Sequence, residues 1–432
     1  MSVKYNKSDL QLSPYLFLAK YNDEETIATN LSTGEILLLT KEEENMLINC
    51  MPDSNGIFEE AGFLVRDKNL VRQLVIERHR TAQHIPSVFN LTILPTLSCN
   101  FRCSYCFENE KRNIRMRNDT SKKIIEFVKR QSPRHQRLNL AWFGGEPLLE
   151  KETIANLTPQ IRSIAKLSDC EFVSSITTNG YLLDTDTINM LKDNNIRFIQ
   201  ITLDGDKKVH DRIRITKNKK GTFDNIFNNL LTCLELFPEG MVTLRVNATY
   251  ETVSSILNVL KLVPNRFRRQ LSLHMHHIMN IDCPTSFSEK FSEMLKYIYQ
   301  SARKMGFEIA VDDYLDPCQA VYCYAERDSN AVIDPSGNVY RCAYSNFSNK
   351  ERVGILNQNG IIDPVGDFDI KWNYLVSLEP NKCSECNYLP ICGFGCPRLR
   401  VSALGSTNCK NRYKFLSDTL RAKVEHIIGH IQ

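Results

Sequence analysis

An alternation of apolar runs and helical patterns between residues 89 and 305 constrains the fold of this 432-residue chain most strongly. Each of six short apolar runs is followed by a segment whose apolar residues recur at helical spacing. Such an alternation predicts a parallel sheet with right-handed crossovers, because a parallel strand returns through a helix. Six units predict an α/β fold, a partial (β/α)6 barrel of the TIM type. The runs are 90–94, 138–143, 172–177, 198–203, 242–247 and 271–276, and the helical segments are 121–131, 151–167, 184–194, 222–236, 253–262 and 286–305.

Polar or glycine-rich motifs follow four consecutive runs, where the predicted strands end. Cys99 follows the first run, residues 144–147 follow the second, 178–180 the third and 204–205 the fourth. In barrels of this kind, catalytic residues gather at the carboxyl ends of the strands. The sequence therefore predicts one active site on one face of the barrel.

Three cysteines in one short loop indicate the chemistry of that site. Cys99, Cys103 and Cys106 are spaced as CxxxCxxC. Three thiolates can hold three irons of a four-iron, four-sulfur cluster, and no fourth cysteine follows at the spacing of a fully ligated cluster. The remaining iron would be open to a substrate or cofactor, which predicts a catalytic cluster. A zinc site is the alternative interpretation.

Composition narrows the class of protein further. Eleven of the fifteen cysteines fall into spaced groups, while Cys50, Cys170, Cys233 and Cys283 are isolated and are predicted to be core thiols. The N-terminus lacks the apolar core of a secretion signal, so we expect a cytoplasmic location. In the reducing cytosol the cysteines stay thiols, which favours metal binding over disulfides. The net charge of +4 gives no argument for nucleic acid, and no apolar run is long enough to cross a membrane.

The cysteine triplet, with Tyr105 between its last two members, resembles the signature of the radical S-adenosylmethionine (SAM) enzymes. The resemblance extends over residues 89 to about 310. In that family the open iron chelates the amino and carboxylate groups of SAM, and one electron releases a 5′-deoxyadenosyl radical that removes a substrate hydrogen. The resemblance implies SAM and one 4Fe-4S cluster as cofactors, and a reducing partner such as flavodoxin or ferredoxin.

Two further motifs match family elements that bind SAM. Gly144, Gly145, Glu146 and Pro147 form the GGEP motif, in which strand-end carbonyls and the Glu146 carboxylate can accept hydrogen bonds from the methionine ammonium group. In the family elements that follow this motif, a hydroxyl side chain and an arginine contact the ribose and the carboxylate of SAM. The matching positions are Thr202, Asp204 and Arg214, and predicted ribose contacts are Thr178 and Asn179. For the charged loop around Arg214, a surface salt bridge is the alternative interpretation.

The C-terminal cysteines resemble the SPASM domain, which carries two auxiliary 4Fe-4S clusters. Eight thiolates would complete both clusters and leave no open iron, which suits electron transfer or a structural role. One or two zinc ribbons are the alternative. The resemblance places Cys318, Cys323, Cys342 and Cys396 on one cluster, and Cys383, Cys386, Cys392 and Cys409 on the other.

The predicted domains are residues 1–84, 85–310 and 311–432. Three strands and a helix capped by Thr40 make the first a small α+β unit that resembles the leader-peptide recognition elements of ribosomal-peptide maturases. A structural cap on the barrel is equally consistent with it. The second domain is the barrel. The third is the SPASM domain, with little apolar sequence of its own and a closing helix over residues 412–431.

These resemblances predict an oxidoreductase that crosslinks a ribosomally made precursor peptide carrying a leader. Sulfatase maturases carry an aspartate after the cysteine that matches Cys342, whereas this chain has Ala343, which weighs against formylglycine formation. Oxidation or epimerisation of a single residue, and a non-catalytic zinc or iron–sulfur scaffold, remain alternatives. Candidate bases are Asp312, Asp313, Glu326 and Asp334, and His274, His276 and His277 are candidate substrate contacts or polar barrel-mouth residues.

Overall fold

The computed structural model describes residues 9–106, 113–237, 241–277, 289–307, 323–367, 369–370, 372–373, 383–402, 416–417, 420–421 and 424. The chain divides into two compact units. Unit 1 comprises residues 1–84, 311–327 and 373–432, and unit 2 comprises residues 85–310 and 328–372. Predictions for Cys283, Asp312, Asp313, Cys318 and Cys409 lie outside the described residues.

Residues 328–372 group with the barrel, although the sequence assigned them to a third domain that metal clusters hold together. The physical reason is strand pairing, because β12 (Asn330–Ile333) lies parallel to the first barrel strand, β6 (Val88–Ile93). Ala331, Ile333 and Val339 are buried in the barrel's own core. This part of the C-terminal region is therefore held by a sheet and an apolar core.

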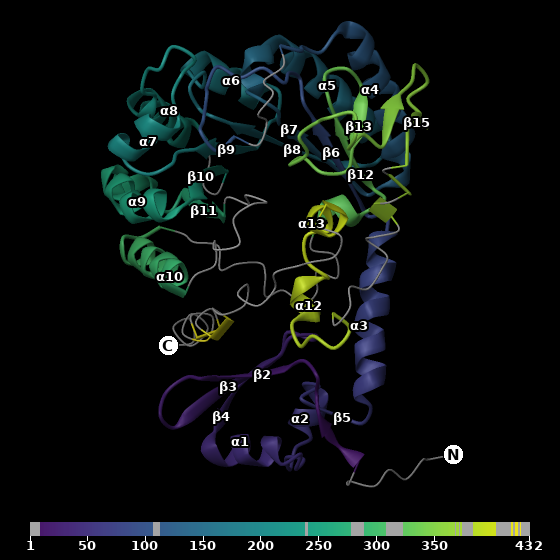
Figure 1. Ribbon diagram of the computed structural model, residues 1–432, viewed down its shortest axis with the longest axis vertical. Helices are drawn as coiled ribbons and strands as arrows, with labels where there is room; N and C mark the ends of the chain where they lie inside the picture. Colours follow the sequence, from purple (N-terminus) through teal and green to yellow (C-terminus); the bar gives the residue numbers. More distant parts are fainter. Residues whose placement is uncertain are drawn as a thin grey trace. The chain divides into compact units, whose positions relative to one another are not determined.

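A ten-stranded sheet forms the frame of unit 2 (Figure 1), in the order β11-β10-β9-β8-β7-β6-β12-β13-β14-β15. Strands β6 to β11 are all parallel, as are β6 and β12, and the remaining pairs are antiparallel. The predicted partial (β/α)6 barrel is confirmed. The other strands are β7 (Arg137–Trp142), β8 (Glu171–Thr178), β9 (Phe198–Thr202), β10 (Val242–Ala248), β11 (Leu271–His277), β13 (Asn338–Tyr340), β14 (Gly354–Leu356) and β15 (Ile362–Pro364).

Helices follow the barrel strands where the sequence predicts them, and α5 (Lys151–Leu167) has the predicted bounds. Side chains cap the N-termini of several of these helices: Asp184 and Thr249 each accept a hydrogen bond from a backbone N–H of the first helical turn. No helix in the described part of the chain is long and apolar enough to cross a membrane. The others are α4 (Asn118–Gln131), α6 (Thr185–Asp193), α7 (Lys207–Ile213), α8 (Phe223–Leu236), α9 (Tyr250–Leu262) and α10 (Glu289–Lys304).

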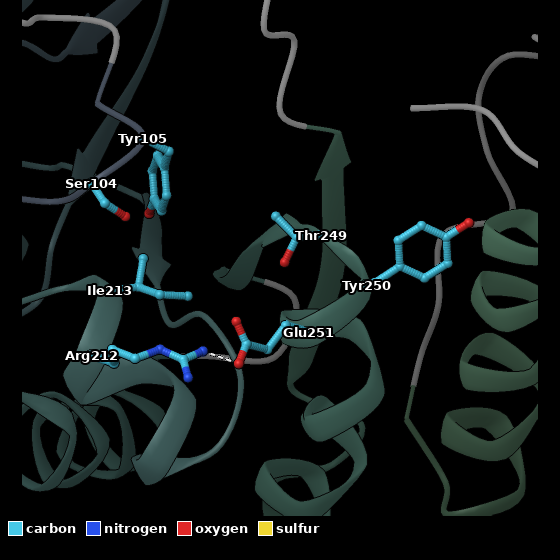
Figure 2. Close-up of a pocket in the computed structure, with 7 residues that line it drawn as sticks. All are labelled: Ser104, Tyr105, Arg212, Ile213, Thr249, Tyr250 and Glu251. Atoms are coloured by element: carbon cyan, nitrogen blue, oxygen red, sulfur yellow. Dashed lines mark hydrogen bonds and ion pairs between the residues drawn. The ribbon is translucent and has the colours of Figure 1, made fainter. Parts of the chain in front are cut away.

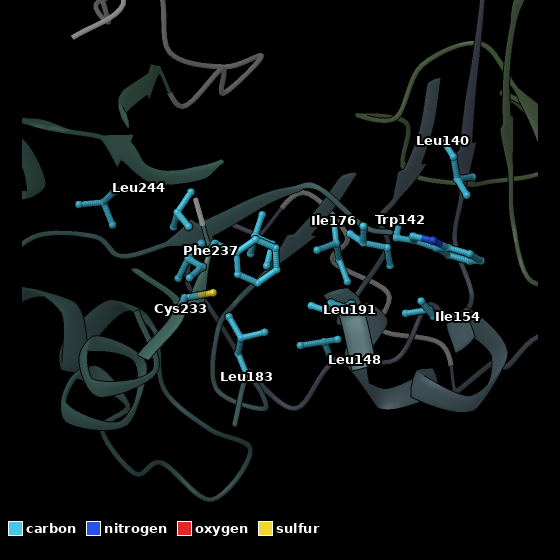
Figure 3. Close-up of a cluster of buried hydrophobic side chains, with 14 of the residues drawn as sticks. Leu140, Trp142, Leu148, Ile154, Ile176, Leu183, Leu191, Cys233, Phe237 and Leu244 are labelled. Atoms are coloured by element: carbon cyan, nitrogen blue, oxygen red, sulfur yellow. The ribbon is translucent and has the colours of Figure 1, made fainter. Parts of the chain in front are cut away.

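The two faces of the barrel sheet differ in character. One face packs against the helices and is apolar, with Leu140, Trp142 and Ile176 at most 1% exposed (Figure 3). On β9, β10 and β11 the opposite face carries Thr202, Arg245 and His274, which are in register with one another. Alternation along each strand produces this division, because successive side chains point to opposite faces. The polar face is the one available for chemistry.

Unit 1 contains a three-stranded antiparallel sheet, β2-β3-β4, and a two-stranded sheet, β1-β5. Thr40 and Glu43 form a reciprocal capping box at the start of α1, as the sequence predicts for Thr40. Leu416, Leu420 and Val424 of the predicted C-terminal helix are buried in the same core as Tyr15 and Ile27. The elements are β1 (Gln11–Leu12), β2 (Leu16–Lys20), β3 (Glu25–Asn30), β4 (Ile36–Thr40), α1 (Lys41–Ile48), α2 (Ile57–Glu60), β5 (Leu64–Val65), α3 (Lys68–Gln83), α12 (Leu389–Cys392) and α13 (Pro397–Ser402).

Candidate active site

The cysteine loop lies beside the segment that follows α7, and backbone hydrogen bonds join the two. The Arg102 N–H donates to the Ile215 carbonyl at 2.8 Å, and the Lys217 N–H donates to the Asn100 carbonyl at 3.0 Å. Within the loop, the Phe101 N–H donates to Cys99 Sγ at 3.4 Å. The described cysteines form no disulfides, so the three predicted cluster ligands are present as thiols.

Gly144 and Gly145 contact the start of the cysteine loop at very short range. A Cβ atom on Gly145 would lie 2.2 Å from the Ser98 carbonyl oxygen, and one on Gly144 would lie 2.5 Å from that of Thr96. The Glu146 N–H donates to the Ser98 carbonyl at 2.9 Å. The two glycines thus allow β7 to fix the loop that carries Cys99, because no larger residue fits against it. Pro147 follows as the first residue of a short 3-10 helix.

Glu146 is fully buried, and its carboxylate joins the ends of β7 and β8. It accepts hydrogen bonds from the Thr178 hydroxyl at 2.8 Å, the Asn179 N–H at 2.8 Å and the Leu148 N–H at 3.0 Å. Burial raises the pKa of Glu146, while these hydrogen bonds act in the opposite direction. Asn179 in turn donates to the Asn100 side chain at 2.7 Å, next to Cys99. Glu146, Thr178 and Asn179 therefore support the cysteine loop, and their direct contacts with SAM remain predictions.

A second group of predicted residues meets at the Tyr105 hydroxyl. Arg214 Nη1 donates to it at 2.5 Å, Asn247 Nδ2 donates to it at 2.8 Å, and the hydroxyl donates to the Asp204 carboxylate. The Asn247 N–H also donates to Asp204, at 2.7 Å. Burial raises the pKa of Tyr105 well above its ordinary value against the opposing charge of Arg214, so Tyr105 remains a neutral phenol that can donate this hydrogen bond. Thr202 lies near this group, in register with Arg245 on the neighbouring strand.

His210 supports the same group from behind. The Asp204 N–H donates to His210 Nδ1 at 3.1 Å, which leaves the ring proton on Nε2 to face the Thr222 hydroxyl at 3.0 Å. Thr222 in turn donates to the Arg214 carbonyl at 2.7 Å. Burial, and secondarily the charge of Arg214, lower the pKa of His210 to about 3, so the ring is neutral.

A cavity of about 490 Å³ opens beside Tyr105 (Figure 2). Its wall combines Ile213 and two tyrosine side chains with two hydroxyl side chains and an ion pair between Arg212 and Glu251. The cavity adjoins the start of α9, where Thr249 is the N-cap residue. The lining residues are Ser104, Tyr105, Arg212, Ile213, Thr249, Tyr250 and Glu251.

The C-terminal candidates fall into both units. Cys342 belongs to unit 2, whereas Cys323, Cys383, Cys386, Cys392 and Cys396 belong to unit 1. Within unit 1, Glu326 and Arg400 form a buried ion pair. The Glu326 N–H donates to the Cys323 carbonyl at 3.0 Å, and the Arg400 N–H donates to the Cys396 carbonyl at 3.1 Å. The ion pair therefore joins two segments that the sequence assigns to one cluster.

The remaining candidates have varied surroundings. Asp334 is buried and organises the β12–β13 turn, where it accepts hydrogen bonds from the Ser336 and Asn338 N–H groups. Glu326 is buried in its ion pair, and Ala343 is 6% exposed. His274 lies on the polar face of β11, and the side chains of His276 and His277 lie outside the described residues.

The described residues fit the predicted cofactors in two respects. Three thiols stand on one loop, with a backbone N–H directed at the first sulfur, and this donor set suits an iron–sulfur cluster. Arg214 is 6% exposed, and within the described residues its Nε–H has no acceptor, which suits an anionic ligand. In the same ranges, no three His, Cys, Asp or Glu side chains converge on a single metal ion. In a cluster each thiolate binds a different iron, so such convergence is not required.

Residues 93–263 match the family model of the radical SAM superfamily, so this part of the chain is a radical SAM domain. A cysteine-type anaerobic sulfatase-maturating enzyme of Clostridium novyi (strain NT) is 25% identical over 337 residues, which cover 72% of this chain and 88% of that enzyme. The chain thus contains a radical SAM domain and is similar to the sulfatase-maturating enzymes. SAM and one iron–sulfur cluster are the cofactors of such a domain, and the three cysteines of the Cys99 loop remain the predicted ligands of that cluster.

Two solved structures share the fold. One is described as "Native anSMEcpe with bound AdoMet and Cp18Cys peptide", with a TM-score of 0.60 and 18% identity, covering 80% of this chain and 100% of that chain. The other is described as "Crystal structure of Streptococcus suis SuiB bound to precursor peptide SuiA", with a TM-score of 0.53 and 13% identity, covering 90% of this chain and 96% of that chain.

Sequence reasoning missed Asn247, Arg245 and His210 as members of the site. Asn247 and Arg245 alternate with the buried Leu244 and Val246 on β10, and this period of two was the signal that could have found them. Arg245 is 9% exposed, and its guanidinium lies 5.7 Å from the centre of the Tyr344 ring. His210 carried no such signal, because its partners come from distant parts of the chain.

Proposed function

We propose that this enzyme forms an intramolecular crosslink in a ribosomally made precursor peptide. The proposal depends on one observation: the fold of SuiB, a structure described as bound to a precursor peptide, matches a larger share of this chain than the fold of anSMEcpe does. The SuiB structure, described as bound to a precursor peptide, covers 90% of the chain, whereas the anSMEcpe structure covers 80%. The proposal extends this fold likeness to substrate class.

The residue after Cys342 supports this choice over formylglycine formation. Sulfatase maturases resemble this chain but have an aspartate at the position of Ala343, where it acts as a base. Ala343 has no ionisable group and is 6% exposed. A crosslinking reaction needs no base at that position, since the substrate radical can attack a neighbouring group.

The polar face of the barrel sheet would receive the peptide. Once bound, SAM and the cluster of the Cys99 loop supply a 5′-deoxyadenosyl radical that removes a side-chain hydrogen atom. Thr202, Arg245 and His274 face this side of the sheet and offer hydrogen-bond donors to a peptide. After the hydrogen atom has been removed, formation of the bond leaves one surplus electron and one proton. The auxiliary clusters would accept the electron, and the proton would pass to solvent. Their proposed ligands are the eight C-terminal cysteines named above.

The small sheet of unit 1 would bind the leader peptide. In the described residues β2 and β4 are its outer strands, so each has one edge available for an added strand. Addition of a strand to such an edge is a common mode of peptide recognition. The Arg421 guanidinium donates to the Lys20 carbonyl at 2.6 Å at the end of β2, which leaves β4 as the less encumbered edge. Leader binding at β4 follows from the proposal.

Co-expression with the precursor peptide from a neighbouring reading frame, followed by mass spectrometry, tests the proposal. The expected product has lost two hydrogen atoms per crosslink, and its fragmentation is blocked between the joined residues. Conversion of a cysteine or serine to formylglycine would instead support single-residue oxidation. An unchanged peptide mass after turnover would favour epimerisation, which deuterium incorporation from solvent would reveal.

A further inference from the structure

The Tyr105 hydroxyl is held by three side chains that come from different parts of the barrel. Asp204 follows β9, Arg214 follows α7, and Asn247 lies in β10, yet all three contact one oxygen atom. Asp204 is fully buried, and Arg214 and Asn247 are 6% and 8% exposed. Because Tyr105 belongs to the cysteine loop, this group connects the loop to two strand ends.

Arg214 is fixed in this group on one side only. Its Nη1 atom donates to the Tyr105 hydroxyl at 2.5 Å and to Asp204 at 3.4 Å, and its guanidinium lies 5.7 Å from the centre of the Phe101 ring. Its Nε–H is buried and has no acceptor among the described residues. A buried donor without an acceptor is costly, so we expect the functional state to supply one.

A carboxylate matches the remaining edge of this guanidinium. Arginine binds carboxylates through two parallel N–H donors, and the edge that includes Nε provides such a pair. Arg214 is positively charged, because a guanidinium keeps its proton in proteins, and the Asp204 carboxylate lies 3.4 Å from its Nη1 atom. The orientation of this edge depends on the contacts that hold Nη1.

We propose that Tyr105, Asp204 and Asn247 are positioning residues that hold Arg214 by Nη1, so that its Nε edge receives the carboxylate of SAM. The proposal rests on the radical SAM domain and on the predicted contact between Arg214 and the cofactor. It is independent of the identity of the peptide. It assigns the tyrosine hydroxyl of the cysteine loop to cofactor recognition through Arg214.

Two ligands that differ only in the carboxylate test the proposal. The dissociation constants of SAM and of decarboxylated SAM are measured by equilibrium dialysis on the full chain after anaerobic reconstitution. The variants are Tyr105→Phe and Asn247→Ala, with Tyr181→Phe as the matched control, because Tyr181 contacts the same Phe101 ring at 5.6 Å. Iron and sulfide contents are measured in each preparation.

For Tyr105→Phe we expect SAM binding to weaken about 3- to 10-fold, which is the usual effect of one lost hydrogen bond. Binding of decarboxylated SAM should stay within about twofold, and Tyr181→Phe should change neither constant. Equal weakening of both ligands would overturn the proposal and indicate general loop packing. Unchanged SAM binding by Tyr105→Phe, or a wild-type chain that does not prefer the carboxylate-bearing ligand, would also overturn it. Failure of the peptide crosslinking proposal would leave all these measurements unaffected.

Discussion

Two buried arginine–carboxylate pairs, one in each unit, lie close to the two sets of predicted cluster cysteines. In unit 2, Arg214 and Asp204 are 3.4 Å apart and surround Tyr105 of the Cys99 loop. In unit 1, Arg400 and Glu326 join the segments that carry Cys396 and Cys323. The same chemical pair thus recurs beside two different metal-binding sequences.

The pairs differ in how many donors the carboxylate receives. Asp204 accepts hydrogen bonds from the Tyr105 hydroxyl, from Arg214 and from the Asn247 backbone. Glu326 accepts one from Arg400, with His79 Nε2 at 3.5 Å, and burial raises its pKa to about 7 despite the arginine. The charge of Arg400 alone does not offset the cost of removing the Glu326 carboxylate from water. We infer that the barrel pair belongs to a ligand site, whereas the other pair is a clamp between two segments.

The largest expected effect separates the two sets of cysteines. Replacing Cys99, Cys103 and Cys106 with alanine should abolish cleavage of SAM, because the open iron is lost. Replacing Cys383 and Cys386 with alanine should leave SAM cleavage without peptide within about threefold and lower the iron content from about twelve to about eight atoms per chain. Detection of 5′-deoxyadenosine and iron analysis provide the measurements. Residual cleavage at the wild-type rate in the triple variant would end the radical SAM interpretation.

Removing one member of the clamp comes next in size. Arg400→Met leaves the Glu326 carboxylate buried without its arginine, which should lower the free energy of unfolding by about 3–5 kcal/mol. The double variant with Glu326→Gln should recover most of this loss, since no buried charge remains. Arg66→Met, which breaks an exposed pair with Glu59, is the control and should cost less than about 1 kcal/mol. Chemical denaturation measures the free energy of unfolding of all three variants. An unchanged free energy of unfolding in Arg400→Met would show that the ion pair does not hold the two segments together.

The contact between the glycine motif and the cysteine loop gives a somewhat smaller effect. A methyl group in Gly145→Ala would meet the Ser98 carbonyl at 2.2 Å, so we expect a loss of about 3 kcal/mol and weaker SAM binding. Gly366→Ala meets no atom within 4 Å, so its cost of about 1 kcal/mol should come only from its positive φ of 67°. Equal stabilities of the two variants, measured by thermal unfolding, would refute the tight contact.

The smallest effect concerns the pH dependence of the barrel network. His210 has a folded pKa of about 3, against about 6.5 when unfolded, so below pH 6.5 the unfolded chain binds a proton that the folded chain does not. The stability that this group contributes is complete above pH 6.5 and should fall by about 2 kcal/mol at pH 5. His210→Gln should remove this part of the decrease in stability with falling pH. If the urea midpoint of this variant falls between pH 7 and 5 as much as that of the wild type, His210 is not the cause.

The barrel could be predicted from sequence because its elements are local patterns. The helix over residues 151–167 has the predicted bounds, and Thr40 caps the start of a helix as predicted. In the site, the cysteine loop and the glycine motif could be placed by chain order at neighbouring strand ends. Their partners could not, because the contacts of Tyr105 with Asp204 and Asn247 span 99 and 142 positions of the chain.

Other features depended on non-local pairing as well. Nothing local in residues 330–333 indicates that β12 pairs with β6, more than two hundred residues earlier. The short helix α7 (Lys207–Ile213) was not predicted, because its seven residues give too little periodicity, although Asp206 caps it. The ligand set of the auxiliary clusters, two members of which lie outside the described residues, remains a prediction.

The route of the chain has a consequence for anyone who cuts or fuses this enzyme. The backbone enters the barrel at residue 85, leaves it at 310, returns at 328 and leaves again at 372. A deletion after residue 310 would remove four strands from the sheet and expose the edge of β6. An unpaired strand edge of this kind promotes aggregation. Chimeras with related enzymes should therefore exchange residues 85–310 and 328–372 together, and keep residues 311–327 and both flanking arms from a single parent.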